Sequence, residues 1–336
     1  MTRKAKILFT AVEFLFLGTV FCYSQNVSIR INSGTTNLTL QNNIERNLSV
    51  LLTQINAANK DAAHIDFDGI QISDIARSSL EMLWHNARFS CPEHSIVERL
   101  LTTYDNTFQI RNIPILITEG QGVSDDDLYQ EAAIDFDKNG VITSFYFGLK
   151  SNQYHDVMKN GAAVADLRMR QIILDYVEHF RTAYIQKDIQ FLDQVFSDDA
   201  LIITGKVVRS VVDDLHPFVT EEIQYREYSK KQYLNRLKNH VFPNAKYIHI
   251  DFSEVKVSRH PTNNKFYGVR VRQAYDSGFY SDDGYLFMLW DFTDEMRPQI
   301  HVRTWQPYWM DEEKTRQIPD NQVIDINSFK GIKSSN

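Results

Sequence analysis

Cysteine is nearly absent from the 336 residues, with only Cys22 and Cys91 present. Cys22 falls in the N-terminal segment discussed below, so we expect no disulfide within the mature chain, which excludes a disulfide-stapled fold. Cys91 follows the predicted end of a helix, where a small buried thiol is the commoner case. Proline (8) and glycine (13) are also scarce, which excludes a collagen-like chain.

A basic excess is missing too, because 36 Lys and Arg residues oppose 43 Asp and Glu residues, for a net charge of −7. Phosphate backbones require a basic face, so nucleic acid is not expected as a partner. The sequence contains no Gly-x-Ser-x-Gly, His-Glu-x-x-His, Cys-x-x-Cys or Rossmann glycine pattern, and we expect no cofactor.

One acidic motif resembles the start of a calcium loop, Asp135-x-Asp137-x-Asn139-Gly140. Its twelfth position is Tyr146, where calcium loops carry a bidentate Glu. Apolar, β-like runs flank the motif, and Asn-Gly is typical of a tight hairpin turn. We therefore predict a β-hairpin and no metal site.

A long hydrophobic run occurs only near the N-terminus. Three basic residues precede the mostly apolar segment 7–21, and small residues stand one and three positions before Gln25. This pattern predicts a signal peptide over residues 1–24, cut after Ser24, and export to a bacterial periplasm or envelope. After cleavage no stable membrane span is expected.

Two alternatives to cleavage after Ser24 stay open. The first is a lipoprotein anchored at Cys22, although the residue before a lipidated cysteine is normally small and here is Phe21. The second is an uncleaved anchor, although the apolar run is short for a bilayer span of about 20 residues.

Residues 25–150 predict a small α+β domain. Apolar residues at helical spacing indicate a helix over 42–59, and Ser73 is a typical N-cap for a second helix that ends near Phe89. Strands follow at 97–104, 107–117 and 128–149, the last being the hairpin around Gly140. The polar segment 151–161 is predicted as the domain boundary.

Residues 162–309 predict a second α+β domain, in which helices cover a curved antiparallel sheet. Its elements are expected as helices 162–187, 188–196 and 229–241, a strand 200–208, an irregular stretch 211–222, and strands 246–258, 265–275, 285–292 and 299–306. Asp282-Asp283 and the acidic run 125–127 are interpreted as solvated turns. Residues 310–336 predict a polar, loosely packed tail.

The order of these elements, with the segments Gln171–Gln186, Lys187–Asp193 and Phe196–Ile202, resembles the nuclear transport factor 2-like superfamily. That superfamily also includes SnoaL-type polyketide cyclases and ketosteroid isomerases. The resemblance implies a cystatin-like cone, in which a curved sheet wraps around helices and leaves a pocket at its open end. It also implies that an enzyme of this kind would use an Asp, or an Asp and a His, inside the cone.

The strand 299–306 carries His301, Arg303 and Trp305 at alternating positions, so we expect them on one face. One interpretation is a pocket wall in which Arg303 binds an anionic group. The other is pairing across the sheet or contact with a second subunit, since Arg and Trp are enriched at interfaces. That interpretation predicts a homodimer through the sheet face.

Five aromatic residues are candidates for the pocket lining, Tyr176, Tyr184, Tyr267, Tyr285 and Trp290, although aromatics at such spacing are more often core. Asp291 lies within an otherwise apolar strand, Leu286 to Phe292, and is the best candidate for an acid or base. A salt bridge from Asp291 to an arginine on the neighbouring strand, Arg270 or Arg272, is the alternative.

The sequence therefore predicts an exported α+β protein whose second domain binds a small apolar ligand or a protein partner without catalysis. A lyase, isomerase or hydrolase that uses Asp291 or His301 in the cone is the first alternative. A structural dimerisation module is the second.

Overall fold

The computed structural model describes residues 26–61, 63–118, 128–160, 163–211 and 219–329. The predicted signal peptide and the acidic run 125–127 lie outside these residues. Among the helices described, none combines the length and the hydropathy that crossing a bilayer requires.

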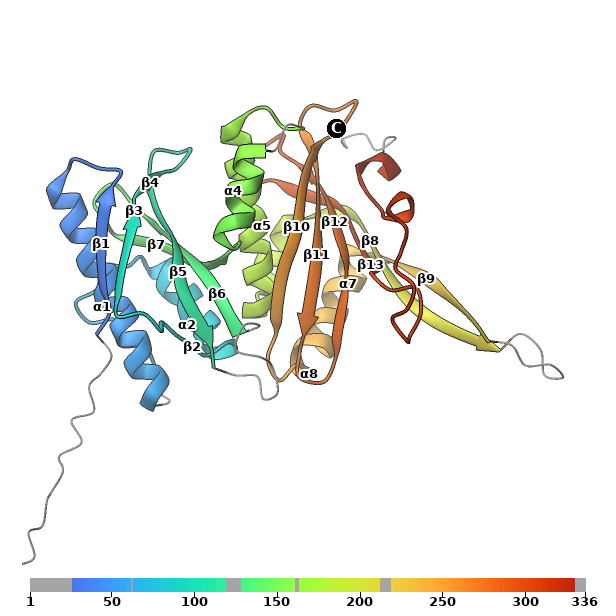
Figure 1. Cartoon of the computed structure of the whole chain (residues 1–336), viewed down its shortest axis with the longest axis horizontal. Coiled ribbons are helices and arrows are strands. Elements are labelled where there is room, and N and C mark those ends of the chain that lie inside the picture. The colour runs from blue at the N-terminus through green and yellow to red at the C-terminus, as the bar shows by residue number, and fades with distance from the viewer. Residues whose placement is uncertain (1–25, 62, 119–127, 161–162, 212–218, 330–336) are drawn as a thin grey trace, which may run out of the picture.

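The first half places two helices against a small sheet (Figure 1). The helices are α1 (Leu38–Asp61) and α2 (Asp74–Asn86), and the sheet contains β2 (Phe89–Ser90), β4 (Leu101–Thr102), β5 (Phe108–Ile117), β6 (Tyr129–Phe136) and β7 (Ile142–Gly148). A separate parallel pair joins β1 (Ser28–Ser33) to β3 (Ser95–Arg99).

Local signals explain these elements. The Ser73 hydroxyl accepts a hydrogen bond from the Ala76 amide at 3.2 Å, which confirms the predicted N-cap of α2. The predicted hairpin is confirmed as β6 and β7, and Gly140 in its turn has a φ of +85°, a conformation that glycine adopts without strain.

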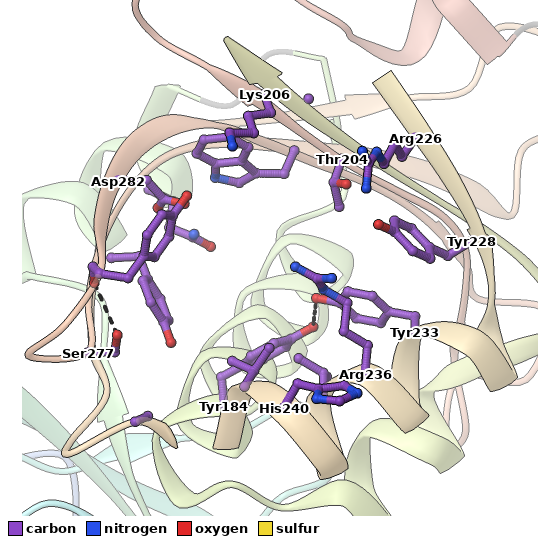
Figure 2. Close-up of a pocket in the computed structure, with 18 of the residues that line it drawn as sticks. Tyr184, Thr204, Lys206, Arg226, Tyr228, Tyr233, Arg236, His240, Ser277 and Asp282 are labelled. Atoms are coloured by element: carbon purple, nitrogen blue, oxygen red, sulfur yellow. Dashed lines mark hydrogen bonds between the residues drawn. The ribbon is translucent and has the colours of Figure 1, made fainter. Parts of the chain in front are cut away.

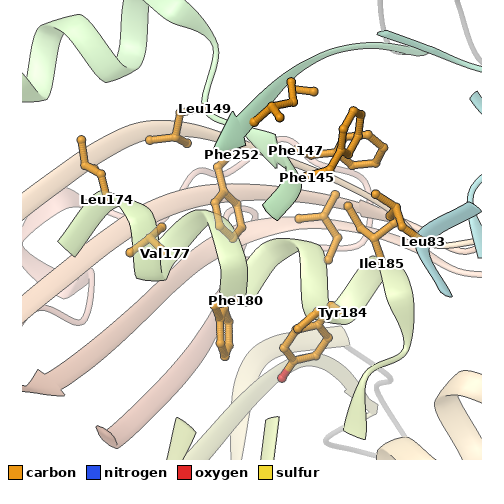
Figure 3. Close-up of a cluster of buried hydrophobic side chains, with 14 of the residues drawn as sticks. Leu83, Phe145, Phe147, Leu149, Leu174, Val177, Phe180, Tyr184, Ile185 and Phe252 are labelled. Atoms are coloured by element: carbon orange, nitrogen blue, oxygen red, sulfur yellow. The ribbon is translucent and has the colours of Figure 1, made fainter. Parts of the chain in front are cut away.

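The polar segment predicted as the domain boundary is mostly helical, forming α4 (Ser151–Asn160). The next helix, α5 (Leu167–Gln186), contacts α2 and β7 of the first half as well as β10 of the second. Figure 3 shows Phe145 and Phe147 on the side of this helix where Ile185 lies. One continuous apolar cluster therefore extends across the position predicted as a domain boundary.

The second half contains a six-stranded sheet in the order β10-β11-β12-β13-β8-β9. Its strands are β8 (Phe196–Val211), β9 (Val219–Ser229), β10 (His249–Arg259), β11 (Phe266–Asp276), β12 (Ser281–Asp291) and β13 (Gln299–Pro307). The sheet curls around α5, α6 (Ile189–Val195) and α7 (Lys230–Arg236), so the predicted α+β architecture with a curved sheet on helices is confirmed (Figure 1).

Two features of this sheet differ from the sequence prediction. Residues 219–222, expected to be irregular, belong to β9. The pair β13 and β8 is parallel, whereas all other pairs in the sheet are antiparallel. No turn joins the last strand to the first, so the hairpin rule that makes sequential neighbours antiparallel does not apply to this pair.

The two faces of the sheet are buried by different segments. Leu286, Met288 and Trp290 of β12 belong to the core cluster around α5. Phe287 and Leu289 face the other way and pack against Ile326. The predicted loose tail is therefore wrong for its described part, because Ile318, Val323 and Ile326 are each at most 7% exposed and cover this outer face.

Candidate functional site

A cavity of about 550 Å³ lies between the inner face of the curled sheet and the helices α5 and α7 (Figure 2). We call it the cone pocket. Its lining comprises Tyr184, Thr204, Gly205, Lys206, Val208, Gln224, Arg226, Tyr228, Tyr233, Arg236, Leu237, His240, Val241, Asn244, Ala245, Ile250, Gln273, Tyr275, Ser277, Phe279, Tyr280, Asp282, Arg303 and Trp305. Aromatic and basic side chains dominate this set.

Tyrosines form much of the pocket wall. Tyr184 of α5 and Tyr233 of α7 join their hydroxyl groups at 2.8 Å, as the dashed line in Figure 2 marks. Burial raises the pKa of Tyr184 well above its usual value, and burial raises the pKa of Tyr275 on β11 to about 12. Tyr184 and Tyr275 therefore stay neutral at physiological pH. Each offers an apolar ring and a hydroxyl group that can form a hydrogen bond.

Arg303 supplies a buried positive charge at this wall. The residue is 7% exposed, and its guanidinium lies 5.2 Å from the ring centroid of Tyr233. Lys206, Arg226 and Arg236 are exposed and also line the pocket, where Figure 2 labels them around the cavity. The cone pocket is therefore basic within a chain of net charge −7.

Asp282 is the carboxylate of the pocket lining. Its Oδ2 accepts a hydrogen bond from the Tyr280 hydroxyl at 2.8 Å. Burial raises the pKa of Asp282 from 3.8 to about 6, so the group is partly protonated in mildly acidic solution.

The sequence prediction missed Asp282 because it interpreted Asp282-Asp283 as a solvated turn. The turn lies earlier, where Gly278 has a φ of +81°, and β12 begins at Ser281. Gly284 is a strand residue, and a Cβ there would lie 2.8 Å from the Trp305 indole. The glycine that suggested a turn instead lets the backbone carbonyl of Gln306 and the Trp305 indole approach this strand closely.

Three of the predicted ligand-binding residues line the cone pocket, namely Tyr184, Arg303 and Trp305. Tyr267 and Trp290 belong to the apolar core, Tyr176 packs against it, and Tyr285 belongs to a cluster on the outer face of the sheet. Tyr176 lies 6.0 Å from Trp290, and Tyr267 lies 5.8 Å from Phe292, as distances between ring centroids. Tyr176, Tyr267 and Trp290 are therefore packing residues, the alternative to a place in the pocket wall.

The candidates for catalysis come together, but outside the cone pocket. His301 Nε2 lies 3.4 Å from Asp291 Oδ2, and His301 Nδ1 lies 3.3 Å from Ser197 Oγ. The His301 ring stacks on Phe266, with 5.4 Å between centroids, and Phe266 belongs to the cluster on the outer face.

A bulge in the sheet explains this placement. The register between β12 and β13 shifts between Leu289 and Trp290, which leaves His301 unpaired. A bulge interrupts the alternation of side chains, so His301 departs from the face that Arg303 and Trp305 share. The predicted common face of these three residues is therefore wrong at His301.

The salt bridge expected from Asp291 to an arginine of the neighbouring strand does not form among the described residues. Arg272 instead donates to Asp283, with its Nη2 at 2.7 Å from Oδ2. Asp291 pairs with His301 and accepts a hydrogen bond from the Thr293 amide at 2.7 Å.

No family model matches this chain, and no curated protein matches it. Among solved structures, Bd1075 of Bdellovibrio bacteriovorus aligns at 15% identity over 50% of this chain and 46% of its own, with a TM-score of 0.32. An NTF2-like protein from Cytophaga hutchinsonii aligns at 13% identity over 41% of this chain and 97% of its own, with a TM-score of 0.27.

A naphthalene 1,2-dioxygenase with indole bound aligns at 7% identity over 49% of this chain and 92% of its own, with a TM-score of 0.35. The alignment with Bd1075 spans less than half of that protein's length. All three TM-scores are below 0.5, so the fold class of this chain rests on its own strand order and curvature.

Proposed function

We propose that this chain is an exported binding protein that holds a small ligand in the cone pocket. The observation that carries the proposal is the cavity of about 550 Å³, walled by tyrosines and Trp305 and enclosed by the sheet and helices. Ligand pockets are typically about 300–1,000 Å³, mostly apolar, with a few placed polar groups. The cone pocket has this size, and its aromatic side chains supply apolar surface, while its lining carries more polar and charged side chains than a typical ligand pocket.

The position of Asp291 and His301 supports binding rather than catalysis. An enzyme needs an acid or base within hydrogen-bond reach of the reacting atoms. His301 stacks on the outer-face residue Phe266, and neither Asp291 nor His301 lines the cone pocket.

A pocket-filling substitution tests the proposal. Thr204 lines the pocket from β8, and Thr204→Trp places an indole in the cavity, whereas Thr220→Trp adds the same side chain at an exposed position on β9. The probe is 8-anilinonaphthalene-1-sulfonate, followed by its fluorescence.

Wild type and Thr220→Trp are expected to bind the probe with equal affinity, and Thr204→Trp at least about 10-fold more weakly, because lost contacts of about 1.4 kcal/mol suffice for that change. Equal binding by all three chains, or binding by none, contradicts the proposal.

A proton-transfer enzyme is the second candidate, and the raised pKa of Asp282 is the observation that favours it. To separate the two functions, a small molecule that co-purifies with the chain from its native host is released and incubated with fresh protein in D2O. A binding protein returns the compound unchanged, whereas a lyase or isomerase changes its structure or its deuterium content. Loss of that change in Asp282→Asn would establish the enzyme.

A further inference from the structure

Two buried hydrogen-bond donors of the cone pocket have no partner among the described residues, Arg303 Nε and Trp305 Nε1. Both residues lie on β13 two positions apart, so their side chains leave the same face of the sheet, and both line the pocket. Arg303 is 7% exposed and Trp305 is 8% exposed. Buried donors of native proteins almost always have an acceptor, so an orphaned pair indicates where a ligand acceptor belongs.

The charge of Arg303 specifies the kind of acceptor. A guanidinium stays protonated in proteins, and a buried cation is unfavourable unless an anion compensates it. Asp282 is the carboxylate of the lining, and its charge favours the charged form of Arg303. The two groups form no direct ion pair within the part of the chain described, so this compensation is incomplete. Next to Arg303, burial raises the pKa of the Tyr184 phenol well above its usual value, so Tyr184 carries no compensating charge, and the ring of Tyr233 lies 5.2 Å from the guanidinium. A ligand anion would complete this buried site.

The exposed basic residues of the lining also favour a negatively charged ligand. Lys206, Arg226 and Arg236 belong to the lining, and clefts lined by one sign of charge concentrate ligands of the opposite sign. The remaining orphaned atom of the lining is Asp282 Oδ1, an acceptor when ionised. It would pair with a hydroxyl or amine group of the ligand.

We propose, resting on the ligand-binding function proposed above, that the cone pocket selects a small aromatic carboxylic acid. Its carboxylate accepts hydrogen bonds from Arg303 Nε and Trp305 Nε1, its ring lies between the tyrosines, and a hydroxyl or amine substituent faces Asp282. A monoanion matches the single buried guanidinium of the lining, whereas the other basic residues, Lys206, Arg226 and Arg236, are exposed to solvent and would be weaker partners for a second charge.

Isothermal titration of the full chain with matched probes tests this assignment. The probes are 2-naphthoate and its neutral isostere 2-naphthamide, and 6-hydroxy-2-naphthoate examines the second contact. Wild type is expected to bind 2-naphthoate at least about 10-fold more tightly than 2-naphthamide, because hydrogen bonds to charged groups contribute the most. The added hydroxyl strengthens binding further, and Asp282→Asn, which keeps a hydrogen-bonding side chain, reduces that gain.

Two variants and one control locate the effect. Arg303→Met removes the charge at similar length, and Trp305→Phe removes the indole N–H and keeps an aromatic ring. Each is expected to lower the preference for naphthoate, Arg303→Met to near equality. Arg270→Met is the matched control, since Arg270 lies over the ring of Tyr285 and does not line the pocket, and it keeps the preference.

The outcomes of these experiments test the preference for a carboxylate separately from the ligand-binding function of the pocket. Equal binding of the two isosteres by wild type, abolished for both by Thr204→Trp, overturns the carboxylate assignment and leaves the ligand-binding function standing. No binding of any naphthalene probe, together with probe fluorescence that Thr204→Trp does not change, overturns both. If Arg303→Met does not fold, Trp305→Phe decides, and a naphthoate preference equal to wild type in that variant contradicts the assignment.

Discussion

At the scale of single residues, Asp282 connects the pocket to solution pH. Its carboxyl is half-buried, and burial raises its pKa from 3.8 to about 6. Between these values the folded state binds more protons than the unfolded state, so the free energy of unfolding falls as pH rises from about 4 to about 6. Below pH 4 both states are protonated and the contribution of Asp282 is fully present.

The variant Asp282→Asn is therefore expected to unfold with less pH dependence than wild type over that range. A shift of this size corresponds to about 3 kcal/mol for a fully buried group, and partial exposure reduces it to about 1–2 kcal/mol. Urea unfolding of both chains at pH 4 and pH 7 measures the difference. Parallel pH profiles would show that the carboxyl titrates as it does in the unfolded chain.

The sequence predicted the surroundings of Gly284 and His301 incorrectly. Gly284 after two aspartates is typical of a turn, yet it lies in β12 beneath the Trp305 indole. His301 alternates with Arg303 in sequence, yet a bulge removes it from their common face. Both errors arise because the register of one strand depends on its neighbours, which lie far away in sequence.

At the scale of elements, helix α5 is distinctive because a buried ion pair joins it to the sheet of the first half. Arg111 Nη1 of β5 lies 3.0 Å from Glu178 Oε2, and Glu178 Oε1 accepts a hydrogen bond from the Leu149 amide at 2.6 Å. Glu178 is 0% exposed and Arg111 is 5% exposed. Removing one partner would leave a buried charge without compensation.

We expect Glu178→Gln to lower the free energy of unfolding by about 3–5 kcal/mol, the usual effect of breaking a buried pair. Glu81→Gln is the matched control, because Glu81 pairs with Arg77 at the surface with half of each side chain exposed, and such pairs contribute little. Chemical denaturation followed by circular dichroism compares the two. A small, equal effect of both substitutions would mean that the pair at Glu178 does not hold α5 to the first sheet.

The elements with strong local signals were predicted well. The helical stripe of α1, the Ser73 cap and the Asn-Gly hairpin depend on residues close in sequence, and each is confirmed. The described part of the tail was predicted as loose because its sequence is polar and charged, although it also contains the apolar residues Ile318 and Ile326. They are buried by contact with the outer face of the sheet, a surface that no local pattern reveals.

At the scale of the whole molecule, the two sheets share the helix between them. Apolar residues from both halves form one continuous cluster, with Phe147 of β7 and Phe252 of β10 both among its members (Figure 3). The domain boundary predicted at 151–161 rested on the polar composition of that segment. Helix α5 contacts elements of both halves, so the two halves share one packed core.

Export is a prediction for the whole chain. If residues 1–24 are a signal peptide, protein isolated from its native host begins at Gln25, and mass spectrometry of the intact chain measures this. A chain that retains Met1 would favour the uncleaved anchor. A chain that begins at a lipid-modified Cys22 would favour the lipoprotein alternative.

The sequence by itself determined the class of the fold, the positions of most helices and strands, and three aromatic or basic residues of the pocket, namely Tyr184, Arg303 and Trp305. These follow from periodicity and turn chemistry, which act over a few residues. The tertiary structure alone decided the face of each strand at the bulge, the burial of Asp282 and the covering of the outer face, because these depend on contacts between segments distant in sequence.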